Sequence, residues 1–137
     1  MKAVNITLIF NGQTEAAFNF YKAAFGAEFI HLQRMKEIPG EHTFSEEESQ
    51  KILHVALPVG GAILMGMDIP QNRPATNPGN NFMVTLDTSS EEETTQLFNA
   101  LSEGGTVMMP LGQQFWSAYF GMVTDKFGIQ WMLSYVK

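Results

Sequence analysis

The sequence contains no cysteine. Disulfide bonds, thiolate metal ligands and a cysteine nucleophile are therefore excluded, and cysteine usage does not indicate a cellular compartment. The chain also lacks an apolar run of membrane-spanning length and a charged-then-apolar signal segment at its start. We therefore expect a soluble, cytoplasmic protein that has no membrane partner.

Basic residues are scarce. Eight Lys and Arg residues stand against 14 Asp and Glu residues, so the formal net charge is −6 at pH 7. Binding to nucleic acid needs clustered Lys and Arg, and the basic residues here are scattered, so we expect no nucleic-acid partner. The acidic balance is compatible with a cationic small molecule as a ligand.

Hydrophobic residues make up 45% of the 137 residues, which is enough for a core, and the length fits one ordinary domain or two tightly fused small modules. The most aromatic stretch, residues 115–133, contains both tryptophans. Its alternating patterns predict strands over residues 117–124 and 129–136, joined by a turn at 125–128. These aromatic side chains form a core or, if the sheet curves around a cavity, also line a pocket.

In the rest of the chain, the patterns predict the same order of strands and helix in each half. The first half has a strand at 4–10, a helix at 14–25 and strands at 28–35, 52–59 and 62–67. Residues 36–50 are predicted to be a loop with a solvated acidic run, and residues 68–81 a linker. The second half has a strand at 82–87, a helix that begins at Ser90 and ends before Gly104, and strands at 106–111 and in the aromatic stretch. Each half is therefore a predicted βαβββ module.

Each helix has one apolar stripe at helical spacing. The stripe of the first helix consists of Ala17, Phe20, Tyr21, Ala24 and Phe25, and that of the second helix consists of Leu97, Ala100 and Leu101. We expect these stripes to pack against the sheets.

Several spaced motifs resemble the PhnB-like family of the vicinal-oxygen-chelate superfamily, which includes glyoxalase I, bleomycin-resistance proteins and extradiol dioxygenases. The motifs are Phe10-Asn11-Gly12, Glu15-Ala16-Ala17, Phe20-Tyr21, His54-Val55-Ala56-Leu57, Gly60-Gly61, Leu64-Met65, Asp68, Phe115-Trp116, Gly121, Val123-Thr124-Asp125, Phe127-Gly128 and Trp131-Met132-Leu133. The resemblance implies an α+β fold, in which two βαβββ modules, about 1–68 and 81–137, form a curved mixed sheet around a cavity. It also implies a single domain over residues 1–137 and a homodimer.

The resemblance also implies where a metal would bind. Metal-dependent members of the superfamily take ligands from the first and last strands of each module, which correspond here to positions near Ile6, Met65, Asn81 and Met132. None of these residues is His, Asp or Glu, and neither are their neighbours Thr7, Leu64, Phe82 and Trp131. Divalent metals need carboxylate or imidazole ligands, so we expect no metal.

We also expect no cofactor. Some PhnB-like sequences carry a demethylubiquinone methyltransferase label, but the chain has no glycine-rich strand-to-helix loop of the kind that a nucleoside cofactor needs.

His54 is the candidate catalytic residue, because it interrupts an apolar strand and matches a position where PhnB-like proteins often have histidine. It is either an acid or base in a pocket or a structural histidine. His31 and His42 lie on other segments, so no metal cluster is expected among the three histidines. Asp68 and Asp125 are expected to bond turns, and Glu15 to stabilise the start of a helix.

The candidate ligand-binding residues form an apolar, aromatic cavity wall in this interpretation. They are Phe115, Trp116, Tyr119, Trp131 and Met65. Three functions remain open. The first is metal-independent binding of a small molecule. The second is an enzyme, either a lyase, an isomerase or a transferase, that uses His54 as acid or base on a small organic substrate. The third is a resistance protein that sequesters a drug.

Overall fold

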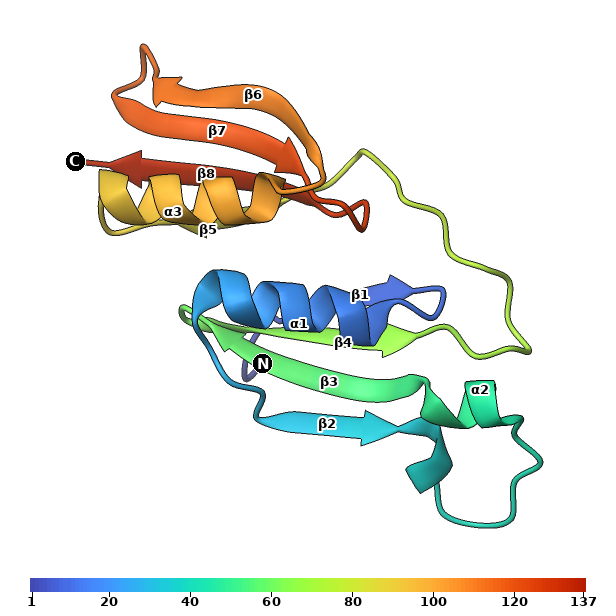
Figure 1. Cartoon of the computed structure of the whole chain (residues 1–137). Helices are drawn as coiled ribbons and strands as arrows, with labels where there is room; N and C mark the ends of the chain where they lie inside the picture. The colour runs from blue at the N-terminus through green and yellow to red at the C-terminus, as the bar shows by residue number, and fades with distance from the viewer. The chain divides into compact units, whose positions relative to one another are not determined.

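The structure is a computed structural model that describes residues 1–137. The chain divides into two compact units, Met1–Thr76 and Asn77–Lys137. Each unit contains one four-stranded mixed sheet, which is not closed, and each has the βαβββ order of elements (Figure 1). The predicted α+β class with two βαβββ modules is therefore confirmed.

The first unit follows the predicted order with one addition. Its elements are β1 (Ile6–Phe10), α1 (Thr14–Phe25), β2 (His31–Arg34), η1 (Met35–Glu37), α2 (Glu46–Gln50), β3 (Ile52–Val59) and β4 (Ala62–Asp68). The strands lie in the order β1-β4-β3-β2. Only the β1–β4 pair is parallel. A two-residue turn at Gly60-Gly61 joins β3 to β4, as its turn signal predicts.

The second unit repeats this topology. Its elements are β5 (Val84–Asp87), α3 (Glu91–Ser102), β6 (Thr106–Gln113), β7 (Ala118–Thr124) and β8 (Gln130–Val136). The strands lie in the order β5-β8-β7-β6, with β5 and β8 parallel. Ser90 is the N-cap of α3, and its hydroxyl oxygen accepts a hydrogen bond from the backbone N–H of Glu93 at 3.0 Å. The predicted start of this helix is therefore confirmed.

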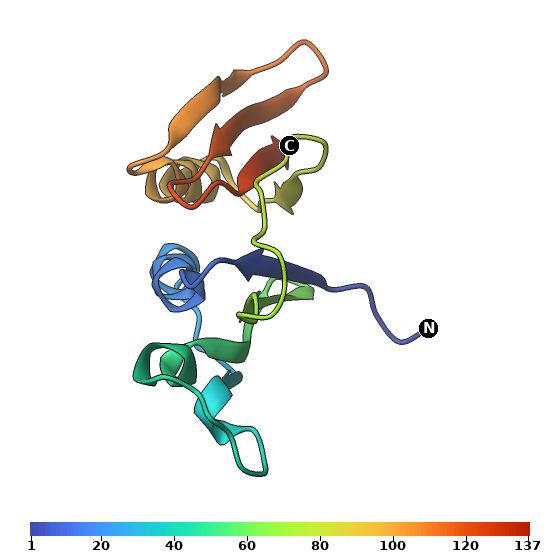
Figure 2. The same ribbon diagram turned by 90° about the vertical axis from the view of Figure 1, so that its right-hand side faces the viewer.

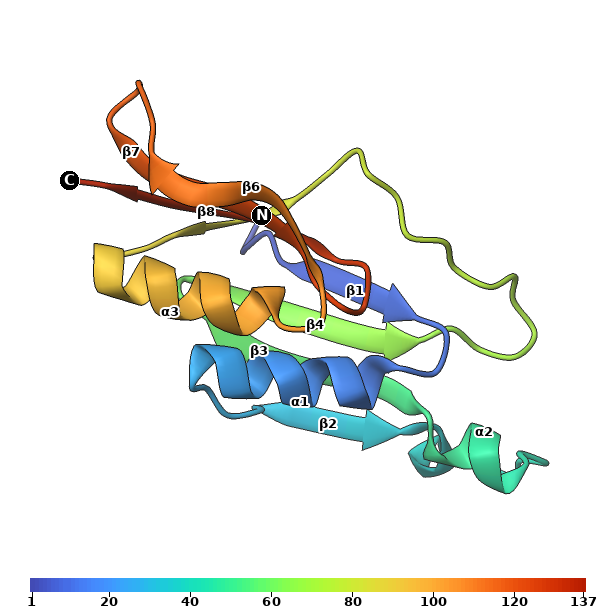
Figure 3. The ribbon, with the colours of Figure 1, turned by 45° about the horizontal axis from the view of Figure 1, so that its top comes forward.

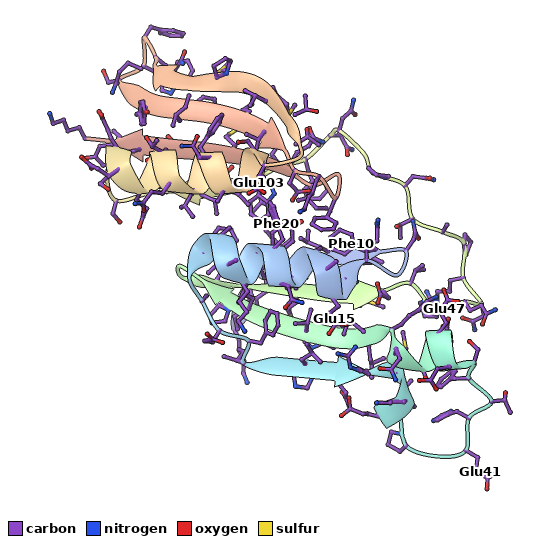
Figure 4. All side chains as sticks on the ribbon, viewed as in Figure 1. Phe10, Glu15, Phe20, Glu41, Glu47 and Glu103 are labelled. Carbon is purple, nitrogen blue, oxygen red and sulfur yellow. The ribbon has the colours of Figure 1, made fainter.

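The predicted loop over residues 36–50 is wrong in part, because it contains η1 and α2. The side chain of Ser45 accepts a hydrogen bond from the N–H of Glu48, and the acidic run 46–48 forms the first turn of α2. Carboxylates at this end of a helix interact favourably with its dipole. Glu48 is buried and pairs with Lys51 at 2.8 Å. Only part of the segment is a loop, with Glu41 near its tip (Figure 4).

Strand ends differ from the prediction by a few residues. The predicted strand 28–35 shortens to β2, and the predicted strand 82–87 shortens to β5. Pairing of β5 begins at Val84 opposite Trp131, near the start of β8, so Phe82 has no partner strand beside it. The predicted linker 68–81 contains no helix or strand except Asp68, the last residue of β4.

The buried side of α1 includes a residue that the predicted stripe omits. Phe18 is fully buried, as are Ala17 and Tyr21, whereas Phe20 and Phe25 are only half-buried. α1 packs on β3 and β4 (Figure 3). The ring of Phe18 lies directly over Gly66 of β4, where an added Cβ would stand 2.8 Å from Phe18 Cζ. The helix approaches the sheet this closely because residue 66 has no side chain.

α3 repeats the same contact in the second unit. Phe98 is buried, although the predicted stripe omitted it, and its ring covers Gly121 of β7. An added Cβ on Gly121 would lie 2.6 Å from Phe98 Cε2. In both modules, therefore, the helix is fixed to its sheet by a phenylalanine ring over a glycine.

Substitution of Gly66 by Ala tests this packing. The added methyl group overlaps the fully buried Phe18 ring, so we expect Gly66→Ala to lower the free energy of unfolding by about 1–3 kcal/mol. Urea denaturation measures the change. Gly61→Ala is the matched control, because a Cβ there meets nothing within 4 Å, and its effect should stay within about 0.5 kcal/mol. Equal stability of the two variants would contradict the packing argument.

Candidate functional site

The face of the first sheet opposite α1 carries most of the chemically useful side chains of this unit. Gly66 faces α1, and side chains alternate along a strand, so Met65 and Met67 point to the other face. No helix covers that face within the unit (Figure 2). The strand register places ten residues there, which we call the first open face: Thr7, Ile9, His31, Gln33, His54, Ala56, Pro58, Ile63, Met65 and Met67.

His54 lies near the middle of the first open face and is half-buried. Its Nε2 atom is 3.2 Å from the Met65 sulfur, and Gln33 is its cross-strand partner on β2. Burial, and to a lesser degree the nearby His31, lower the pKa of His54 from its ordinary value of 6.5. The ring is therefore mostly neutral at pH 7, which suits a proton acceptor or a hydrogen-bonding partner of a ligand.

His31 is a site residue that the sequence analysis did not identify. Its ring centroid lies 5.1 Å from that of His54, with an angle of 48° between the planes. The two histidines are diagonal neighbours, because His31 pairs with Ala56 and Gln33 pairs with His54. Spacing along the chain hides this proximity. The proximity could be found only by pairing the predicted strand 28–35 with the predicted strand 52–59. In the observed register, both histidines then lie on the same face of the sheet.

The second sheet also has a face opposite its helix. Because Gly121 faces Phe98 of α3, Phe120 and Met122 point away from that helix. The strand register adds the residues that pair with these two, and the second open face includes Thr85, Asp87, Thr106, Met109, Phe120, Met122, Thr124, Gln130, Met132 and Ser134. Trp116, in the connection between β6 and β7, packs edge-to-face on Phe120 with ring centroids 5.4 Å apart. Phe115 contacts Trp116 and is 95% exposed.

Tyr119 and Trp131 lie on the opposite, helix-facing side of the second sheet. The Tyr119 hydroxyl is 3.1 Å from the Thr95 hydroxyl of α3. Trp131 is 0% exposed, and its indole N–H donates to Asp125 at 2.8 Å. The structure thus places Trp116 against the second open face and Met65 and His54 on the first. Tyr119 is half-buried beside α3, and Trp131 belongs to the core beneath that helix. Ligand binding by any of these residues stays a prediction.

The positions that the family resemblance implies for a metal offer poor donors. Met65 pairs with Thr7, and Met132 pairs with Thr85. The prediction that Asn81 occupies the corresponding position of the second module is wrong, because β5 begins at Val84 and Thr85 lies opposite Met132. Thioether and hydroxyl groups suit a divalent metal poorly without carboxylate or imidazole ligands. The structure contains no group of three or more His, Asp or Glu side chains arranged to hold a metal.

The two buried aspartates, Asp68 and Asp125, form hydrogen bonds with turns and connections, as the sequence predicts. Asp68 accepts hydrogen bonds from the N–H groups of Gly12, Thr14 and Ile52 and from the Thr14 hydroxyl. Asp125 accepts from the N–H groups of Phe127 and Ile129 and from the Trp131 indole. Both carboxylates therefore hold connections together.

Glu15, labelled in Figure 4, pairs with Arg34 of β2. A hydrogen bond from Arg34 lowers the pKa of Glu15. The residue therefore links α1 to β2 in addition to its place in the first turn of the helix.

The fold is that of the glyoxalase/bleomycin-resistance/dioxygenase proteins. The chain superposes on a glyoxalase/bleomycin resistance protein/dioxygenase family enzyme from Burkholderia phytofirmans with a TM-score of 0.66, over 97% of both chains. The sequence identity of 15% makes this a likeness of fold alone.

Within this fold class, the chain belongs to the family described as 3-demethylubiquinone-9 3-methyltransferase, whose model matches residues 2–134. Protein PA1353 from Pseudomonas aeruginosa is 36% identical, with a TM-score of 0.84 over 98% of both chains. The PhnB protein from Bacillus cereus is 29% identical, with a TM-score of 0.71 over 98% of this chain and 100% of that chain. The predicted PhnB-like relationship is therefore confirmed. None of the helices is long and apolar enough to span a membrane.

Titration of the histidines tests the environment of His54. We expect its pKa to lie below 6.5, and substitution His31→Gln to raise it only part of the way back, because burial is the larger cause. The unfolded chain then binds the proton more readily, so the free energy of unfolding should fall as the pH is lowered through 6.5 towards the folded pKa. Heteronuclear NMR of the ring carbons reports the titration. His42→Gln is the control and should leave the His54 curve unchanged; a His54 pKa above 6.5 would refute the assignment.

Proposed function

We propose that the protein binds a small organic molecule on its open faces without the help of a divalent metal. The observation that carries this proposal is the first open face, where soft apolar side chains surround His54 and His31. Methionine adapts to ligands of different shape, and binding sites commonly combine an apolar wall with a few polar groups. The aromatic pair Trp116 and Phe120 gives the second open face the same character.

An enzyme that uses His54 as acid or base is the second candidate. The specific observation in its favour is the lowered pKa, which leaves a neutral imidazole able to accept a proton at pH 7. A lyase or an isomerase would need such a group beside the substrate. A pH–rate profile controlled by the pKa of His54 would distinguish turnover from binding.

Methyl transfer, which the description of the family names, has less support in this chain. A nucleoside cofactor is usually held by a glycine-rich connection between a strand and a helix, whose free N–H groups bind phosphate. Here the β1–α1 connection donates its N–H groups from Gly12 and Thr14 to the Asp68 carboxylate. The start of α3 is capped by Ser90. Sequestration of a cationic drug stays open and would show salt-sensitive binding without turnover.

Mass spectrometry of the protein purified without an affinity tag tests the proposal. We expect a small organic compound in the denatured extract and the same amount of it after EDTA treatment. Met65→Ala should reduce this amount severalfold, because it removes apolar contact from the first open face. Val107→Ala is the control, since Val107 pairs with Val123 on the helix-facing side of the second sheet. A divalent ion present at one per chain and lost with the compound would contradict metal independence, and a compound unaffected by Met65→Ala would contradict the location.

We also propose that the protein is a homodimer in the cytoplasm. Each sheet has two outer strands with one edge that is unpaired within the sheet, β1 and β2 in the first and β5 and β6 in the second, and unpaired strand edges favour association. Sedimentation equilibrium at micromolar concentration should give twice the chain mass of 15.3 kDa. A single species with the mass of one chain would contradict the dimer.

A further inference from the structure

His54 has no anionic partner on its own face. β1, β3 and β4 contribute only uncharged neighbours to this face, namely Thr7, Ile9, Ala56, Pro58, Ile63, Met65 and Met67. β2 contributes Gln33 and His31. His31 is therefore the only other ionisable side chain of the first open face, and no carboxylate, Lys or Arg lies on it. Two neighbouring imidazoles without a negatively charged partner are suited to bind a negatively charged group of a ligand.

The hydrogen-bonding capacity of His54 is also largely unused. Its Nε2 atom is 3.2 Å from the sulfur of Met65. A thioether is a weak acceptor, so this contact satisfies the ring nitrogen much less than an oxygen atom would. Gln33, the cross-strand partner, is half-buried and supplies an amide that both donates and accepts. An oxygen-bearing ligand could replace the sulfur contact at little cost.

Burial and His31 together oppose the charged form of His54 and lower its pKa. A negative charge placed beside the ring would favour the protonated form of His54 instead. The reason is that a hydrogen bond between an imidazolium and an anionic oxygen is stronger than one between neutral groups. Apart from Thr7 and Gln33, the remaining residues of the face are apolar and suit the body of such a ligand. The overall charge of −6 disfavours anions only at long range, since salt screens it beyond about 8 Å at physiological ionic strength.

We propose that the ligand of the first open face is a small organic acid, whose carboxylate or enolate oxygen bonds to His54 beside His31 and whose apolar body packs on Met65 and Met67. This inference rests on the proposed small-molecule function and narrows it to one chemical class. Binding takes up a proton on His54 when the pH lies between the pKa of His54 in the free protein and its higher pKa in the complex. Affinity for the acid therefore falls about tenfold for each unit of pH in that range.

Three probes of equal size and different charge test the inference: 2-naphthoate, 2-naphthamide and 2-naphthylmethylammonium. NMR of the histidine rings follows their binding to the full chain between pH 5.5 and 8.5. We expect naphthoate to bind at least about tenfold more tightly than the amide and the ammonium compound near pH 6.5. We also expect naphthoate to raise the pKa of His54 and to lose affinity as the pH rises. The pH dependence is measured on the wild-type protein, so this test remains valid even if a variant fails to fold.

Variants then locate the effect. His54→Gln should reduce the affinity for naphthoate to that for the amide and abolish the pH dependence, and His31→Gln should have a smaller effect. His42→Gln, which changes a histidine on the loop between η1 and α2, should leave binding unchanged. Equal binding of the amide, or naphthoate binding that does not respond to pH or to His54→Gln, would overturn the acid class while leaving small-molecule binding intact. Failure of naphthoate to bind would also overturn the proposal of an organic acid. The proposed small-molecule function would then be tested by the compound extracted from the purified protein.

Discussion

The close contact between a phenylalanine ring and a glycine is the constraint on which each module depends. Phe18 covers Gly66 in the first unit, and Phe98 covers Gly121 in the second. This contact brings the helix onto one face of the sheet and leaves the other face without a helix. Because side chains alternate along a strand, the glycine also fixes which neighbours reach the open face. Met65 and Met67 are on the first open face for this reason.

A second constraint holds the connections of the first module in place. The Asp68 carboxylate bonds to N–H groups at the start of α1 and at the start of β3, which are more than 50 and 16 residues away in the chain respectively. One buried side chain thus joins the end of β4 to two other elements. A rigid frame of this kind lets the open face keep half-buried histidines and methionines, whose packing contributes less to stability.

Much of the fold could be predicted from the sequence, because strand alternation, the helix stripes and the turns at Gly60-Gly61 and 125–128 all give local signals. The missing parts depend on contacts that are distant in the chain. The predicted stripes lack Phe18 and Phe98, because nothing local shows that a glycine lies beneath each ring. For the site, His54 and Met65 could be named, but the proximity of His31 follows from strand register. The aromatic character of Trp131 predicts a place in a cavity wall, whereas alternation around Gly121 puts it beneath α3, where it is fully buried.

The glycine contact also distinguishes the two halves of the chain from each other. Val55 lies opposite Gly66 in the first sheet, whereas Gly121 lies opposite Leu133 in the second, so the glycine occupies different members of equivalent strand pairs. An exchange of one strand between the modules would therefore leave a phenylalanine over two glycines or over none, giving a void in one case and a clash in the other. Exchange of a complete hairpin would also misplace the glycine, because Phe18 lies over the second strand of its hairpin and Phe98 lies over the first strand. The halves are thus alike in architecture, yet each helix fits only the hairpin of its own module.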